Sequence, residues 1–249
     1  MKLDFLKFTP RKAENAFYRL GLSDFQSLKR KDEIQFYIKL AFFPILDLSI
    51  FPNDLNINNI NTVINEMKSI SKDNFDTLYS YKFKGQLGSG EILLYFILNN
   101  AKLAPAAAGG RQESHDLLHK DDKYEVKSAR ISTRGEASNF RLSKGLKIDN
   151  VINKLYDLRN QVISPSSSKI ISINDTKKLR DSKPKEFDLI EKEYQSIAYS
   201  DYFKNHEVIF LNNYYKKVQE IKSVEKGDIM IEQIIPGTDG ATITPKIKL

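Results

Sequence analysis

Residues 115–132 read HDLLHKDDKYEVKSARIS, two runs of strand-forming residues around a polar turn at 119–123. Successive side chains of a strand point to opposite faces. Glu125 and Lys127 therefore share one face of the second strand, and their neighbours in the sequence share the other. Burying a carboxylate and an ammonium on an otherwise apolar strand is costly unless both have partners. The pattern favours a strand whose polar face lines a functional site.

A hairpin of this length brings Asp116, at the head of the first strand, back beside Glu125. Phosphodiester hydrolysis needs a hard cation that neutralises the phosphate and lowers the pKa of a bound water. The carboxylates of Asp116 and Glu125 offer oxygen ligands of the kind that Mg²⁺ (or Mn²⁺) prefers. Lys127 can orient the attacking water and stabilise charge that develops on the phosphate. These residue types predict a metal-dependent phosphodiesterase.

Asp116 followed by Glu125-x-Lys127 on neighbouring strands resembles the signature of the PD-(D/E)XK, restriction-endonuclease-like nucleases. The proline that usually precedes the aspartate is replaced here by His115. The resemblance implies that Asp116 and Glu125 hold the metal and that the backbone carbonyl of Val126 completes its coordination. It also implies that the substrate is DNA, cut by a nuclease of restriction, repair or phage type.

A helix that carries an acidic residue commonly precedes the two strands in such nucleases. Residues 88–90 read GSG and open an apolar helix at Glu91, which is similar. The resemblance therefore implies that Glu91 is a third carboxylate of the metal site, bound directly or through water. It covers residues 80–165 and a later strand at 207–211.

Two interpretations of the hairpin itself stay open. In the first, it is a surface hairpin whose Glu125 and Lys127 simply face water, as in many antiparallel sheets. In the second, the register differs, and Asp121 or Asp122 replaces Asp116 as metal ligand.

A zinc site and a phosphate-binding loop are two further, weaker interpretations of this part of the sequence. His115 and His119 are spaced as zinc ligands on a helix, but the segment has the pattern of a strand and turn, and no third ligand is evident. Residues 84–91, KGQLGSGE, lack the Gly-Lys-Ser/Thr ending of a phosphate-binding loop. We therefore expect no nucleotide cofactor.

Basic residues follow the proposed site closely along the chain, and cationic side chains of this kind suit contacts to phosphates. The predicted nucleic-acid contacts are Arg111, Arg130, Arg134, Arg141 and Lys144. The whole chain carries 39 Lys+Arg against 32 Asp+Glu, a net charge of +7, which favours polyanionic partners.

RNA cleavage would use the same metal chemistry, and a homodimer would explain a double-strand cut. The main alternative is a non-catalytic DNA-binding or assembly protein that keeps a nuclease-like fold.

The amino-acid composition excludes several other classes of protein and site. The chain has no cysteine, which excludes disulfides, thiolate metal sites and a cysteine nucleophile. The most apolar stretch, 37–51, is interrupted by Lys39, Pro44 and Asp47 and is shorter than the roughly 20 residues that cross a bilayer. We expect a protein of a reducing cytoplasm that has no membrane partner. The abundance of Asn, Ile and Lys fits the AT-rich genome of a phage or a bacterium.

We expect an α/β fold in which helices flank a mixed central sheet. A helical N-terminal region (1–78), a nuclease-like core (79–215) and a C-terminal β-hairpin extension (216–249) are predicted. Helix-spaced apolar residues predict helices within 11–43, at 57–70, from Glu91, at 148–163 and at 186–198. Strands are predicted at 207–211, 228–235 and 241–247.

Overall fold

The structure, a computed structural model, describes residues 47–80, 88–99, 101–103, 115–142, 146–164, 168–237 and 240–249. The helices predicted within residues 11–43 lie outside the described residues, as do Arg111 and Lys144 of the predicted DNA contacts.

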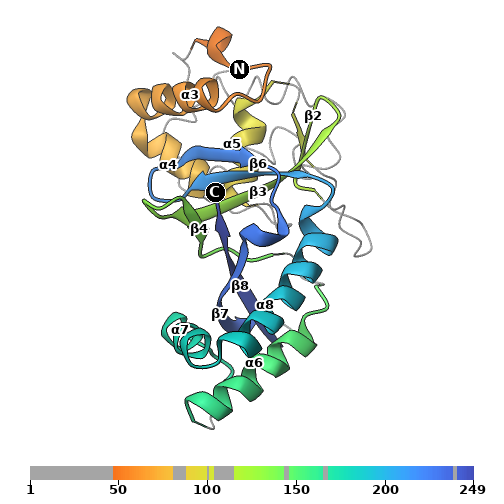
Figure 1. Cartoon of the computed structure of the whole chain (residues 1–249). Coiled ribbons are helices and arrows are strands. Elements are labelled where there is room, and N and C mark those ends of the chain that lie inside the picture. The colour runs from red at the N-terminus through yellow and green to blue at the C-terminus, as the bar shows by residue number, and fades with distance from the viewer. Residues whose placement is uncertain are drawn as a thin grey trace.

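The described residues form a mixed α/β fold (Figure 1). Its α-helices are α3 (Ile57–Ile70), α4 (Lys72–Ser80), α5 (Ser89–Ile97), α6 (Asp149–Val162), α7 (Ile173–Ser182) and α8 (Pro184–Ala198). Its strands are β1 (Lys102–Leu103), β2 (Leu117–His119), β3 (Asp122–Ile131), β4 (Glu136–Ser138), β5 (Glu207–Asn212), β6 (Lys217–Lys222), β7 (Ile229–Gly237) and β8 (Gly240–Lys248). Short turns of other helix types are η1 (Leu48–Ile50), η2 (Tyr199–Phe203) and η3 (Lys226–Asp228).

Strand β3 is the centre of the sheet. The strands follow the order β1-β2-β3-β4-β8-β7, and β5 branches from β3 and pairs with β6. Among the described strands the β3–β5 pair is parallel and the other pairs are antiparallel. In the parallel register Glu125 lies beside Val208, and Lys127 lies beside Phe210. The predicted α/β class with a mixed sheet is therefore confirmed.

Two hydrophobic clusters flank this sheet. One contains the buried residues of α3, α4 and α5 with Val126, Ile209 and Leu211; the other contains those of α6, α7, α8, β7 and β8 with Val208 and Phe210. The side chains of β5 therefore alternate between the clusters, as the period of a strand requires. Figure 1 shows α3, α4 and α5 together above the sheet and α6, α7 and α8 beside the β7–β8 hairpin.

Helix α3 illustrates why the helices form where the sequence predicts them. The Asn56 side chain accepts hydrogen bonds from the backbone N–H groups of Asn58 and Asn59 and so caps the helix. The buried residues Ile60, Val63, Ile64 and Met67 lie on one face. The predictions at 57–70, 148–163 and 186–198 are confirmed by α3, α6 and α8, and those at 207–211, 228–235 and 241–247 by β5, β7 and β8.

Helix α7 was not predicted, because charged residues dominate it and only Thr176 and Leu179 are buried. Its start nevertheless carries a sequence signal. The Ser172 hydroxyl accepts from the backbone N–H of Asp175, and the Asp175 carboxylate accepts from the backbone N–H of Ser172, which is a capping box. The local cap and two buried contacts are thus sufficient for a helix that lacks an apolar face.

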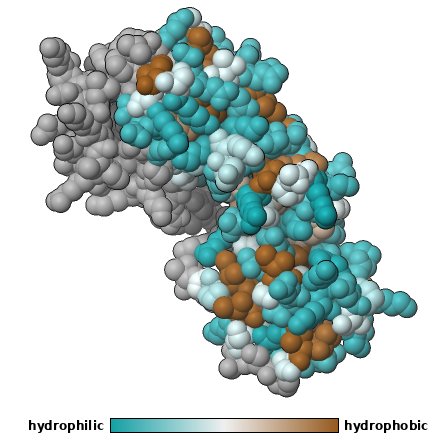
Figure 2. Space-filling model, turned by 90° about the vertical axis from the view of Figure 1, so that its left-hand side faces the viewer, coloured by the Kyte–Doolittle hydropathy of each residue, from teal (hydrophilic) through white to brown (hydrophobic). Residues whose placement is uncertain are grey.

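The molecular surface is uneven in hydropathy. Figure 2 shows hydrophobic side chains gathered on the lower half of the face that it draws. Exposed large hydrophobic residues of the α7 and α8 region are Ile170, Ile173 and Leu189. None of the helices that the structure describes is long and apolar enough to cross a membrane.

Candidate active site

The β2–β3 hairpin is tighter than the predicted turn. Lys120 and Asp121 form a two-residue loop, with φ values of 50° and 71°. Two left-handed residues in succession are typical of the type I′ turn that matches the twist of a hairpin. The register pairs Leu117 with Tyr124, and the Tyr124 carbonyl accepts a 3.0 Å hydrogen bond from the Asp116 N–H, which brings Asp116 to Glu125. Asp121 lies at the exposed hairpin tip, so it does not replace Asp116 beside Glu125.

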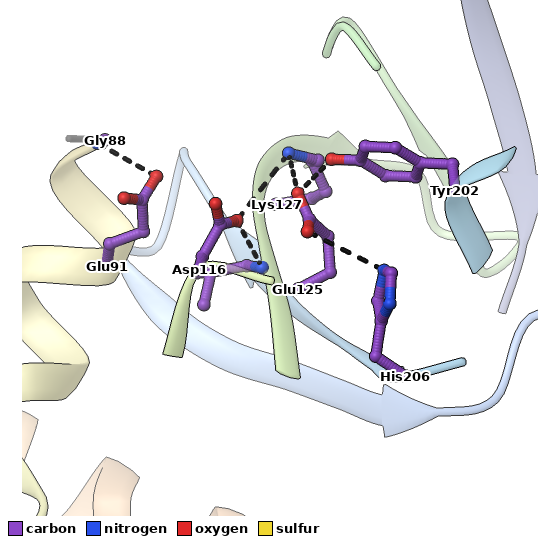
Figure 3. Close-up of polar contacts among 8 residues, drawn as sticks. Gly88, Glu91, Asp116, Glu125, Lys127, Tyr202 and His206 are labelled. Atoms are coloured by element: carbon purple, nitrogen blue, oxygen red, sulfur yellow. Dashed lines mark hydrogen bonds and ion pairs between the residues drawn. The ribbon is translucent and has the colours of Figure 1, made fainter. Parts of the chain in front are cut away.

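Asp116, Glu125 and Lys127 lie together on this hairpin (Figure 3). The Lys127 Nζ lies 2.7 Å from Glu125 Oε1 and 3.8 Å from Asp116 Oδ2. Asp116 Oδ2 also accepts a 2.9 Å hydrogen bond from the Val126 N–H. Glu125 is 4% exposed, so the interpretation as a hairpin whose charges face water is wrong.

Tyr202 and His206 enclose Glu125 from the opposite side. The Tyr202 hydroxyl donates a hydrogen bond to Glu125 Oε1, and its ring centroid lies 5.2 Å from the Lys127 Nζ. The His206 Nε2 lies 3.7 Å from Glu125 Oε2. Burial lowers the pKa of His206. The imidazole is therefore neutral at neutral pH, and this contact is polar rather than an ion pair.

The sequence did not single out Tyr202 as a site residue. Tyr202 belongs to η2, a π-helical turn that follows α8 and precedes β5. Single π-helical turns are rare and occur frequently at functional sites. The sequence held only an indirect signal for Tyr202, which is that a buried carboxylate such as Glu125 needs a hydrogen-bond donor. In the structure, β5 pairs in parallel with β3, so the residues just before β5 lie near the start of the polar face of β3.

Glu91 lies on the Asp116 side of the cluster (Figure 3). Its Oε1 accepts a 2.9 Å hydrogen bond from the Gly88 N–H at the start of α5. A Cβ on Gly90 would lie 2.8 Å from Ser128 Oγ and 3.1 Å from Val126 Cγ1. Glycine at position 90 therefore lets the helix contact β3 closely enough to bring Glu91 to the hairpin.

The carboxyl groups of Glu91, Asp116 and Glu125 lie around a single ammonium, that of Lys127. Burial, reinforced by the Asp116 carboxylate, raises the pKa of Glu91 to about 8. Burial also raises the pKa of Asp116 to about 7, although the Lys127 ammonium opposes the change. Burial alone lowers the pKa of Lys127, but the Glu125 and Asp116 carboxylates outweigh it and raise that pKa. The cluster is therefore short of positive charge at neutral pH.

The predicted basic residues that the structure describes lie on the surface. Arg130 is at the end of β3, Arg134 is in the loop after it, and Arg141 follows β4; all three are exposed. The Val126 side chain lies in the cluster with α3, α4 and α5, so only its backbone faces Asp116. His115 and His119 are buried, with His119 at the end of β2 rather than on a helix.

The donor chemistry suits a hard divalent cation, since Asp116, Glu125 and Glu91 supply carboxylate oxygens and the pKa values of Asp116 and Glu91 are raised. In the described parts of the chain, no group of three or more His, Cys, Asp or Glu side chains is close enough to hold a metal ion. The reason is that Glu125 is turned to Lys127 and Tyr202, and Glu91 is turned to Gly88. Two of the three carboxylates must turn before all three can share a cation.

No family model matches this chain, and neither a curated protein nor a solved structure matches it. The site's own geometry and chemistry therefore carry the functional argument.

Proposed function

We propose that this chain is a divalent-cation-dependent endonuclease that hydrolyses phosphodiester bonds of DNA. The observation that carries the proposal is the buried Lys127 ammonium between the Glu125 and Asp116 carboxylates, on a hairpin that Glu91 approaches from a helix. This arrangement supports the resemblance to the PD-(D/E)XK nucleases in residue types and in order along the chain.

Asp116, Glu125 and Glu91 are the residues that would hold Mg²⁺ or Mn²⁺, with the Val126 carbonyl as a further oxygen ligand. The cation would neutralise a phosphate and lower the pKa of a bound water. The raised pKa values of Asp116 and Glu91 support this assignment, because both carboxyl groups gain a counter-charge when they ionise around a cation.

Lys127 supplies a fixed positive charge. Its raised pKa keeps it protonated across the physiological range, and it already donates to Glu125. An ammonium at this position can hydrogen-bond the water or a non-bridging phosphate oxygen. A proton on the leaving oxygen has to come from solvent or from a water that these residues hold.

Tyr202 acts as a positioning residue for the same two groups. Burial, and then the Glu125 carboxylate, raise the pKa of Tyr202 well above the usual value of a phenol. Its hydroxyl therefore stays protonated and donates to Glu125, which fixes the carboxylate beside Lys127. Preorganised groups of this kind keep their geometry at the moment of reaction.

The test is cleavage of supercoiled plasmid and of linear DNA with Mg²⁺ or Mn²⁺. We expect the wild type to nick or degrade the DNA, and Glu125→Ala and Lys127→Ala to lose about 100-fold or more in rate. Glu207→Ala and Lys123→Ala are matched controls, because both residues are exposed on the same pair of strands. Circular dichroism checks that each variant is folded, and Asp116→Asn is a milder second variant.

A specific observation favours the alternative, a non-catalytic DNA-binding or assembly protein. The oxygen Oε1 of Glu125 is engaged by both Lys127 and Tyr202, as a structural ion pair would be. If the wild type cleaves neither DNA nor RNA with either metal but binds DNA, this alternative replaces the nuclease. If the wild type cuts RNA but not DNA, and the same variants are inactive, the proposed metal-dependent hydrolysis is supported and the proposed substrate, DNA, is wrong.

A further inference from the structure

The tip of the β5–β6 hairpin is braced from within and from α3. The Asn212 Oδ1 accepts hydrogen bonds from the backbone N–H groups of Tyr214, at 3.0 Å, and Tyr215, at 3.3 Å. The Lys68 Nζ of α3 donates to the backbone carbonyls of Tyr215, at 2.8 Å, and Lys216, at 3.2 Å. The backbone that carries the two tyrosines is therefore held in one conformation.

Helix α4 and strand β3 hold the same tip. The Tyr79 hydroxyl donates a 2.9 Å hydrogen bond to Asn213 Oδ1, and the Asn213 N–H donates a 2.8 Å bond to the Ala129 carbonyl. Lys216 forms an ion pair with Asp76 of α4. The loop is thus hydrogen-bonded to α4 and to β3 as well as to α3.

This braced tip presents two aromatic rings to solvent. Tyr214 is 83% exposed and Tyr215 is 59% exposed. Their ring centroids are 4.9 Å apart with the planes at 88°. Neither ring is buried in a core, so stability does not explain their presence. Exposed aromatic surface on a rigid backbone is typical of a binding site.

The tyrosines border an open groove with a volume of about 820 Å³. Its other lining residues include Arg130, Ser132, Thr133, Asn139, Asn213 and Gln219. These side chains offer a guanidinium, hydroxyl groups and amides, which are donors for phosphate and for base edges. The groove therefore combines aromatic surface with hydrogen-bond donors.

Charged side chains of both signs line the groove, and further cations lie beside it. Arg130 lines it, and the exposed Arg134 follows the lining residue Thr133. Lys217 lies 5.6 Å from the Tyr215 ring centroid. Glu220 is the acidic residue among those that line the groove. Proteins bind single-stranded nucleic acid with cationic side chains near exposed aromatic rings, because every unpaired base can stack on a ring.

We propose that this groove binds unpaired nucleotides of a nucleic-acid strand, with a base stacked on Tyr214 and phosphates on Arg130. The inference rests on the proposed function, for which it names the substrate class: DNA that has a single-stranded segment. Arg130 is three residues after Lys127 on β3, about 10 Å along the strand. Because the offset is an odd number of residues, the Arg130 and Lys127 side chains point to opposite faces of β3, so binding at the groove and cleavage at the cluster are measured separately.

The test is fluorescence anisotropy with labelled oligo(dT) of about 20 nucleotides and a duplex of equal length. EDTA is present, so binding is measured without cleavage. We expect the wild type to bind oligo(dT) more tightly than the duplex. Stacking of one base is worth about 1–3 kcal/mol, so Tyr214→Ala weakens oligo(dT) binding by at least about fivefold. Tyr214→Phe keeps the ring and retains affinity within about twofold, and Leu189→Ala, which removes an exposed side chain elsewhere, has no effect.

The two proposals fail separately. If oligo(dT) binding is weak or does not depend on Tyr214, the inference is overturned whether or not the wild type cuts plasmid. If binding depends on Tyr214 but no nucleic acid is cut, the inference survives and the nuclease does not. If Tyr214→Ala changes self-association in sedimentation and leaves oligo(dT) binding intact, the tip is a protein contact and the inference is wrong.

Discussion

The charge cluster on β3 and the tip of the β5–β6 hairpin depart in opposite directions from the usual distribution of side chains. Glu125 is 4% exposed, whereas Tyr214 is 83% exposed. Proteins bury charges only when these are paired, and they seldom present rigid aromatic rings to water. Both departures occur on the frame of β3 and β5. The cluster thus depends on burial for its proposed chemistry, whereas the tip depends on exposure for its proposed contacts.

The largest effect on stability is expected when the buried Glu125 carboxylate loses the Lys127 ammonium. Lys127→Met removes the ammonium that lies 2.7 Å from Glu125. Breaking one partner of a buried ion pair costs about 3–5 kcal/mol, and we expect a loss of that size in the free energy of unfolding by urea. A loss below about 1 kcal/mol, the range of an exposed ion pair, would show that the pair is solvated.

The double variant Glu125→Gln/Lys127→Met is the control for that loss. It removes both charges, so it should recover much of the lost stability. An additive loss would mean that packing of the Lys127 side chain, rather than the charge, is what the protein needs.

Tyr202→Phe tests the next contact of Glu125. The variant removes only the hydroxyl that donates to the carboxylate. A hydrogen bond to a charged group contributes about 1.5–3 kcal/mol, and we expect a loss of that order in urea unfolding. Tyr194→Phe is the matched control, because the buried Tyr194 hydroxyl has no hydrogen-bond partner among the described residues. Equal losses in the two variants would contradict the role given to Tyr202.

The pH dependence of stability tests the shortage of positive charge. The folded pKa values of Glu91 and Asp116, about 8 and about 7, lie above their usual values of 4.5 and 3.8. The folded state therefore holds more protons than the unfolded state, so stability falls as pH rises from about 4 to about 8. Each carboxyl group contributes up to about 1.4 kcal/mol per pH unit. Urea unfolding in EDTA at several pH values measures the slope.

Glu91→Gln cannot ionise, so it should flatten this slope, while Glu207→Gln, an exposed control, should keep it. A wild-type slope of zero across this range would contradict the raised pKa values. Because a divalent cation competes with these protons, added Mg²⁺ should stabilise the wild type more at pH 8 than at pH 6.

Local patterns in the sequence predicted much of this frame. The alternation around Glu125 and Lys127 predicted their shared face, and the apolar spacing at 57–70 predicted α3. Both signals are short-range, since a strand has a period of two and a helix a period of 3.6 residues. The hairpin between Asp116 and Glu125 follows from its length and polar turn in the same way.

The rest depends on contacts between distant residues. Tyr202 reaches Glu125 across 77 positions of the chain, because β5 lies parallel to β3 and η2 precedes β5. Nothing in a single sequence fixes that register. The bracing of the β5–β6 tip by Lys68 joins residues 147 and 148 positions apart and was equally out of reach.

A substitution at the β5–β6 tip should change stability least. Tyr214→Ala removes a ring that is 83% exposed on a tip whose backbone is held by Asn212 and Lys68. Substitutions of exposed side chains usually change stability by less than about 0.5 kcal/mol, and we expect that result in urea unfolding. A larger loss would mean that the ring supports the fold. An unchanged stability together with weakened oligo(dT) binding would separate the two regions: the cluster would hold its groups by burial, and the tip would keep its ring available for a partner.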